Sequence, residues 1–148
     1  MSMTMNRKET RYIIVHCSAT SPSMAVDAAM IDRWHRAKGW LGIGYHKVIR
    51  RDGVVEPGRD ENTVGAHTLN YNAFSVAVCM AGGVAEGTEI PETNFTDAQW
   101  AALEQVVREW LVKWPDAKVC GHRDLNATAC PTFDVAAWWQ KVNPKESV

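Results

Sequence analysis

The chain has few cysteines for its length, and they show no pairing pattern. Its 148 residues contain four, and none belongs to a CxxC pair. Four scattered cysteines are too few for a disulfide framework. The missing CxxC pair argues against a zinc knot built from four thiolates. We expect at least two of them to be buried free thiols. The four are Cys17, Cys79, Cys120 and Cys130.

Long apolar runs are also missing. No stretch approaches the roughly 18 apolar residues that a membrane-spanning helix needs, so no membrane insertion is expected. The first ten residues, MSMTMNRKET, lack the apolar segment of about 7–15 residues that a secretory signal contains. We therefore interpret residues 1–10 as a disordered or frayed tail and expect synthesis in the cytoplasm without a signal peptide.

Neither sign of charge dominates. Sixteen Lys and Arg side chains stand against 17 Asp and Glu side chains, which gives a net charge of −1. A nucleic-acid partner usually requires a basic excess or stripe, so none is expected. Hydrophobic residues make up 46% of the chain, enough for a core at this length. We predict a single domain over residues 11–142, a C-terminal tail over 143–148, and a monomer.

What the chain does contain is an alternation of strand and helix patterns. The β-branched run RYIIVHC predicts a buried strand over residues 11–17, with His16 at its C-terminal end. Asp52-Gly53 is typical of a hairpin turn. The fold class predicted is therefore α/β, a central mixed β-sheet with helices packed on its faces. Further strands are expected at 45–51, 54–56, 75–80 and 117–120, and helices at 27–38, at 96–114 and from Asp134 onward.

The helix at residues 96–114 carries the clearest local signals. Thr96 and Gln99 have the spacing of a capping box, and Phe95 and Trp100 that of a hydrophobic staple. Pro115 follows and cannot continue the helix. These signals predict both ends of the helix from neighbouring residues alone.

Two predicted strands lead into histidines, and a cysteine follows the second of them. His16 and His122 lie at these strand ends, and Cys130 follows in a short loop before Pro131. Two imidazoles and a thiolate match a catalytic zinc site, which keeps one position open. Two other interpretations remain: hydrogen-bonded core histidines, or a papain-like protease in which the thiolate is the nucleophile.

The other histidines receive separate interpretations. His46 alternates with Tyr45 and is expected to be structural, on the opposite face of its strand. His35 lies in the Trp-His-Arg-Ala-Lys end of a helix and is expected to be solvated. His67, in a Gly-Ala-His loop, is a candidate for supporting a metal ligand or contacting substrate.

Taken in order, several motifs resemble one family. The chain resembles the zinc-dependent N-acetylmuramoyl-L-alanine amidases that share a fold with peptidoglycan recognition proteins, and above all single-domain bacteriophage endolysins of the coliphage-lysozyme type. The resemblance extends from about Tyr12 to Trp139. The motifs are VHCSAT (15–20), GYH with RRDG (44–53), VGAH (64–67), SVAVC (75–79) and GHRD…ACP (121–131).

The resemblance implies roles for individual residues. The family's zinc ligands fall on His16, His122 and Cys130, with one Zn²⁺ per chain. Its catalytic tyrosine falls on Tyr45, which would hydrogen-bond the attacking water or the developing oxyanion. Its second catalytic position falls on Thr128, where the coliphage enzyme has lysine and some active recognition-protein amidases have threonine. Another branch of the family carries a catalytic glutamate at the position that Cys79 occupies in this chain.

The activity implied is hydrolysis of the amide bond between N-acetylmuramic acid and the L-alanine of the stem peptide, with peptidoglycan (muramyl peptide) as partner. Such an endolysin would act on the cell wall after holin-type release, although recycling of muropeptides in the cytoplasm would also fit. Two alternatives are a binding module without hydrolysis, which the presence of Cys130 argues against, and an additional inhibitor of a phage RNA polymerase. The second is implied only by likeness to the coliphage protein, and this N-terminal tail differs from that of the relative.

Overall fold

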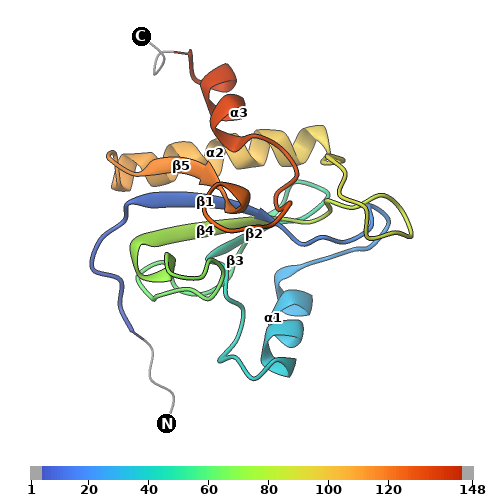
Figure 1. The fold of residues 1–148 in the computed structure, drawn as a ribbon, viewed down its shortest axis with the longest axis horizontal. Helices are drawn as coiled ribbons and strands as arrows, with labels where there is room; N and C mark the ends of the chain where they lie inside the picture. Colours follow the sequence, from blue (N-terminus) through green and yellow to red (C-terminus); the bar gives the residue numbers. More distant parts are fainter. Residues whose placement is uncertain (1–4, 145–148) are drawn as a thin grey trace.

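The computed structural model describes residues 5–144. Five strands form one sheet in the order β3-β2-β4-β1-β5, with three α-helices around it (Figure 1). No helix within these residues is long and apolar enough to cross a bilayer. The strands are β1 (Tyr12–Cys17), β2 (Lys47–Ile49), β3 (Val55–Pro57), β4 (Ser75–Met80) and β5 (Lys118–Gly121). The helices are α1 (Ala28–Ala37), α2 (Asp97–Lys113) and α3 (Val135–Val142), with 3₁₀ turns η1 (Asn72–Phe74) and η2 (His122–Asp124).

The sheet is mixed, as predicted. β1 pairs in parallel with β4 on one side and with β5 on the other, and β2 also runs parallel to β4. Only β3 is antiparallel, through the hairpin with β2. Because β1, β4 and β5 are parallel neighbours, their C-terminal ends meet at one edge of the sheet. Residues that follow these strands are thereby brought together.

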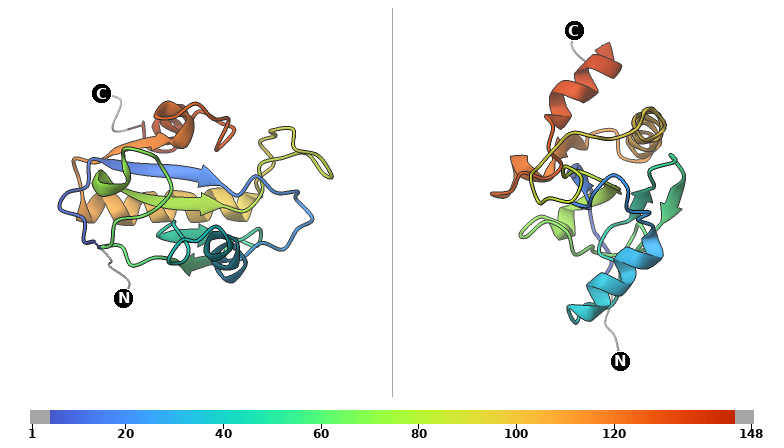
Figure 2. Two further views of the ribbon diagram at one scale, coloured as in Figure 1. Left: turned by 60° about the horizontal axis from the view of Figure 1, so that its bottom comes forward. Right: turned by 90° about the vertical axis from the view of Figure 1, so that its right-hand side faces the viewer.

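The two faces of the sheet are covered by different helices. Along β1, Val15 and Cys17 point to the face that packs against α2 and α3. His16 alternates with them and points to the opposite face. On that face α1 packs through Ile31 against Val48 and its neighbours. Figure 2 shows α1 and α2 on opposite sides of the sheet. His16 is thus buried near α1 and not within the larger apolar core.

The helix ends follow the predicted caps. The Asp27 carboxylate accepts the Met30 N–H at the start of α1. At the start of α2, Thr96 and Gln99 form the reciprocal capping box. The Gln99 side chain, fully buried, also donates to the carbonyls of Ile49, the last residue of β2, and Ala81, which follows β4. The cap therefore joins the helix to the sheet as well as satisfying its first turn.

The hairpin differs from the prediction in the length of its first strand. β2 begins at Lys47, so Tyr45 and His46 precede it. Their carbonyls still accept hydrogen bonds, from the N–H groups of Arg59 and Gly58, at 2.8 and 2.9 Å. Although the chain bends at these two residues, the hydrogen bonds continue the pairing beyond the regular strand and hold Tyr45 in place.

Residues 5–10 pack against the domain, although residues 1–10 are predicted to be a frayed tail. The Arg7 side chain donates to the Glu61 carbonyl at 2.7 Å, and its guanidinium lies 4.9 Å from the Trp114 ring centroid. Asn6 forms a β-bridge with Thr63. At the other end Asn143 caps α3. Residues 1–4 and 145–148, the rest of the two predicted tails, lie outside the described residues.

Candidate metal centre

Three candidate ligands from distant parts of the chain meet at the C-terminal edge of the sheet. His16 is the next-to-last residue of β1, and His122 follows β5 as the first residue of η2. Cys130 lies in the loop between η2 and α3. One ligand atom from each lies within 4.8 Å of the other two. The group could therefore hold a metal ion with three protein ligands.

Each of the two histidines is oriented by side chains that contact its Nε2 atom. His16 Nδ1 lies 3.8 Å from Cys130 Sγ, while Nε2 faces the His67 and Thr68 side chains, each at 3.1 Å. His122 Nε2 lies 3.0 Å from Asn126 Oδ1. In both rings Nε2 is occupied and Nδ1 is left for a metal. Metal-binding histidines are commonly held in this way.

The cysteine is fixed by the backbone around it. The Cys17 N–H donates to Cys130 Sγ at 3.2 Å, which stabilises negative charge on sulfur. The Arg123 N–H donates to the Cys130 carbonyl at 2.8 Å. The carboxylate of Asp124, the acid nearest the ligands in sequence, accepts the Gly121 N–H at 2.8 Å. That carboxylate is therefore engaged in holding η2.

The protonation state of the two histidines suits metal binding. Burial, followed by the neighbouring histidines, lowers the pKa of His16 well below its usual value, and burial also lowers the pKa of His122. Both rings are therefore neutral near pH 7, the form that ligates metals. The pKa of Cys130 is raised, first by its hydrogen bond with the Cys17 side chain and then by burial. A cysteine protease needs a thiolate of lowered pKa, so this environment does not favour the papain-like alternative.

Tyr45 lies beside the ligands and lines a cavity. Its ring centroid is 5.0 Å from that of His16. Burial raises its pKa well above 10, which keeps the phenol protonated as a hydrogen-bond donor. The cavity has a volume of about 300 Å³. It is lined by Ser18, Ile31, Trp34, His35, Lys38 and Tyr45.

Thr128 lies on the exposed part of the loop that carries Cys130. Its Oγ1 accepts the Cys130 N–H at 3.3 Å. This contact uses a lone pair of the hydroxyl and leaves its proton available to donate. Thr128 lies two residues before Cys130, and its hydroxyl helps to fix the conformation of the loop.

The remaining histidines fall into three environments. His67 contacts His16 directly, as described above. Both ring nitrogens of His46 face backbone groups, the Ala77 N–H at 3.1 Å and the Thr63 carbonyl at 2.8 Å, which fits the structural role expected of it. The expectation of a solvated His35 is wrong. It is buried, and its Nδ1 accepts the Gly44 N–H at 2.9 Å, because the chain after α1 folds back over the helix end.

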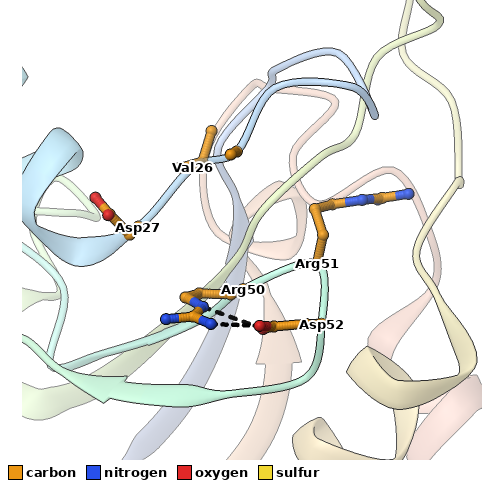
Figure 3. Close-up of a pocket in the computed structure, with 6 residues that line it drawn as sticks. Val26, Asp27, Arg50, Arg51 and Asp52 are labelled. Carbon is orange, nitrogen blue, oxygen red and sulfur yellow. Dashed lines mark hydrogen bonds and ion pairs between the residues drawn. The ribbon is translucent and has the colours of Figure 1, made fainter.

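A second pocket lies apart from these residues. It has a volume of about 280 Å³ and is lined by Ala25, Val26, Asp27, Arg50, Arg51 and Asp52, most of them labelled in Figure 3. Its main polar feature is the ion pair of Arg50 with Asp52, drawn as dashed lines. It contains none of the predicted site residues, so the cavity beside Tyr45 is the one relevant to the metal group.

Two residues that orient the candidate ligands were not predicted from the sequence. Asn126 lies four positions after His122, a spacing that places it beside the ring in a helical turn, and this signal was available in the sequence. Thr68 follows His67 and gives no comparable signal. Its contact with His16 joins residues 52 positions apart and depends on the fold.

The fold and the site together define a mixed α/β protein with two histidines and a cysteine at one sheet edge, a group that could hold a metal ion. Residues 6–133 match the family model of N-acetylmuramoyl-L-alanine amidases. The chain belongs to this family, which confirms the resemblance drawn from its motifs.

Individual relatives agree with this assignment. The endolysin of Klebsiella phage KP32 is 48% identical over 136 residues, which cover 91% of this chain and 89% of that protein. The solved structure of the N-acetylmuramoyl-L-alanine amidase LysC from Clostridium intestinale superposes with a TM-score of 0.82 at 26% identity, over 99% of this chain and 91% of LysC. A Drosophila PGRP-LB mutant in complex with tracheal cytotoxin gives a TM-score of 0.72 at 26% identity, over 93% and 85% of the two chains. The predicted fold class is thereby confirmed.

Proposed function

We propose that this protein is a zinc-dependent endolysin that hydrolyses the amide bond between N-acetylmuramic acid and the L-alanine of the stem peptide. The observation that carries the proposal is the group of His16, His122 and Cys130, whose ligand atoms lie within 4.8 Å of one another beside the Tyr45 cavity. Membership of the amidase family and the phage endolysin relatives support the reaction and its place in host lysis. Release through a holin-type route would bring the protein to the cell wall.

The donor set fits zinc. Two neutral imidazole nitrogens and one thiolate, with no carboxylate among them, match the ligands of catalytic zinc sites, where three protein ligands leave a position open. When bound, zinc supplies a Lewis acid for the scissile carbonyl and a source of nucleophilic hydroxide near neutral pH. Binding also requires the Cys130 thiol to lose its proton, so affinity for the metal rises with pH.

The protein's own residues orient the substrate and stabilise charge. Tyr45 donates its phenolic O–H to the oxygen that becomes negative as the carbonyl is attacked. Lys38 lines the same cavity and supplies a positive charge for the carboxylates of the stem peptide. The indole of Trp34, also in the lining, offers an apolar wall. We assign His67 to the support of His16 and not to substrate contact.

Thr128→Ala is expected to lower turnover, but by less than removal of the Tyr45 hydroxyl. The threonine donates a neutral hydrogen bond from an exposed loop, where competition with water weakens it. Steady-state kinetics of the two variants on soluble muropeptide would rank them. If the Thr128 variant were the slower of the two, Thr128 would be the main transition-state contact and the assigned roles would be reversed.

Digestion of purified sacculi tests which bond is cut. New α-amino groups should belong to alanine, with no rise in reducing sugar ends, and mass analysis should show intact glycan strands freed of whole stem peptides. New reducing ends would indicate a glycosidase, which usually needs a pair of carboxylates flanking the sugar bond. New amino groups on residues other than the first alanine would indicate an endopeptidase. Either result would overturn the proposal.

A further inference from the structure

A chain of polar groups leads from His16 into the protein on the side away from Cys130. His16 Nε2 lies 3.1 Å from both Thr68 Oγ1 and His67 Nδ1, and those two atoms are 2.8 Å apart. On the far side of its ring, His67 Nε2 lies 3.5 Å from Ser75 Oγ. The Ser75 hydroxyl donates to the Tyr71 carbonyl at 2.8 Å. The side chains of His16, Thr68 and Ser75 are almost completely buried.

The carbonyl at the end of the chain sets the direction of every hydrogen bond in it. The Tyr71 carbonyl can only accept, so the Ser75 proton is committed to it. Ser75 Oγ then offers His67 Nε2 a lone pair, and His67 must carry its proton there. His67 Nδ1 is consequently an acceptor, which takes the Thr68 proton. Thr68 Oγ1, whose proton goes to His67, offers a lone pair to His16, so His16 must be protonated on Nε2.

The opposite direction leaves unpaired groups. With the His16 proton on Nδ1, Thr68 would donate to His16 and accept from His67 Nδ1. His67 Nε2 would then present a lone pair to Ser75 Oγ, whose proton is already used. A neutral imidazole, the form in which histidine ligates a metal, has one N–H and one lone pair to place. An acceptor left without a donor inside the protein is destabilising, which favours the first arrangement.

The loop that contains His67 and Thr68 is held firmly in place. The Asn72 side chain accepts the N–H groups of both His67 and Thr68, each at 2.9 Å. A Cβ atom on Gly44 would lie 2.0 Å from the Ala66 carbonyl oxygen, so only glycine allows the two segments to approach this closely. The Thr68 and His67 side chains are therefore fixed before any metal binds.

We propose that the hydrogen-bonded side chains and carbonyl of Tyr71, Ser75, His67 and Thr68 lock His16 as the tautomer protonated on Nε2 and so make Nδ1 its metal-binding atom, with Thr68 as a positioning residue. The inference rests on the proposed zinc centre and adds the device that prepares one of its ligands. It assigns a role to Thr68 and Ser75, which do not belong to the group of candidate ligands. Groups that orient a ligating histidine typically change metal affinity by roughly 10–100-fold.

Nuclear magnetic resonance tests the tautomer directly. Long-range proton–nitrogen spectra of the full-length protein, recorded metal-free and with one equivalent of Zn²⁺, distinguish protonated, unprotonated and coordinated ring nitrogens. We expect His16 to carry its proton on Nε2 in both samples and His67 to carry its own on Nε2. A His16 proton on Nδ1 in the metal-free sample, or zinc on His16 Nε2, would overturn the proposal without any substitution.

Substitution of Thr68 tests the effect on the metal. Thr68→Val keeps the shape and removes the hydroxyl, and should raise the zinc dissociation constant roughly tenfold, the lower end of the range, since the direct contact with His67 remains. Thr68→Ser restores the hydroxyl and should bind zinc as the parent does. The matched control is Thr63→Val, because Thr63, within residues 5–144, contributes only backbone hydrogen bonds. Parent-like zinc affinity in Thr68→Val would contradict the proposal.

The two proposals fail in different ways. If the parent binds no zinc in a chelator competition, the proposed zinc centre is wrong, while the metal-free spectra still decide the tautomer. If the parent binds zinc and Thr68→Val binds it equally well, only the positioning role is wrong. A lower folding midpoint in Thr68→Val with unchanged zinc affinity would assign Thr68 a structural role alone.

Discussion

Alanine in place of His16, His122 or Cys130 is expected to abolish hydrolysis and to remove the metal. The parent should contain one zinc per chain, and each variant should contain much less, since two protein ligands hold the ion far more weakly than three. Cys130→Ser should also lose most of its activity, because a neutral hydroxyl is a poor zinc ligand. Elemental analysis of the purified proteins and release of muropeptides from sacculi measure the two effects.

The remaining buried cysteines supply the controls for this prediction. Cys17→Ala and Cys79→Ala should retain the metal, because neither belongs to the group of three candidate ligands and the Cys17 backbone N–H that contacts Cys130 Sγ remains. Loss of zinc from either variant would show that the ligand set is wrong. In the parent, a chelator should stop hydrolysis and added zinc should restore it. Full activity in protein shown to be metal-free would refute the mechanism.

Tyr45→Phe is expected to lower turnover by about 10²–10³ while leaving the fold and the bound zinc unchanged. This is the usual cost of removing one donor to a developing oxyanion. The ring still fills its place between His16 and His35, at centroid distances of 5.0 and 5.5 Å, so packing is preserved. The loss should appear in kcat and much less in KM, since the hydrogen bond strengthens in the transition state.

Single-turnover kinetics and zinc content of the same preparation check this result. Wild-type turnover in Tyr45→Phe would make Tyr45 a packing residue only. Loss of zinc in the variant would instead place the tyrosine in support of the metal. His46→Gln serves as a neighbouring control, because within residues 5–144 the ring nitrogens of His46 bond backbone groups alone and its loss should act through stability.

Features that depend on neighbouring residues could be predicted from the sequence. The capping box of Thr96 and Gln99, the cap at Asp27 and the Asp52-Gly53 turn all form as expected. Each arises from groups within a few residues of one another, so no tertiary information is needed. The buried strands also follow from their β-branched runs.

Features decided by distant contacts could not be predicted. Trp-His-Arg-Ala-Lys has the composition of a solvated helix end, yet His35 is buried because residues 40–44 fold over it. Tyr45 lies outside the regular strand, where pairing with Arg59 replaces the ladder. The polar composition of the N-terminal residues does not predict that the Arg7 side chain donates a hydrogen bond to the Glu61 carbonyl. Each of these contacts joins segments that a local pattern cannot relate.

The family, the mixed α/β class and the residue types that could ligate a metal follow from the order of the motifs and the hydrophobic period, which are properties of the linear chain. The tertiary structure decided that His16, His122 and Cys130 come within 4.8 Å of one another, since parallel pairing of β1 and β5 aligns their ends. It also decided which nitrogen of His16 faces the group. That choice depends on the directions of hydrogen bonds running through Thr68, and only folding brings those donors and acceptors together.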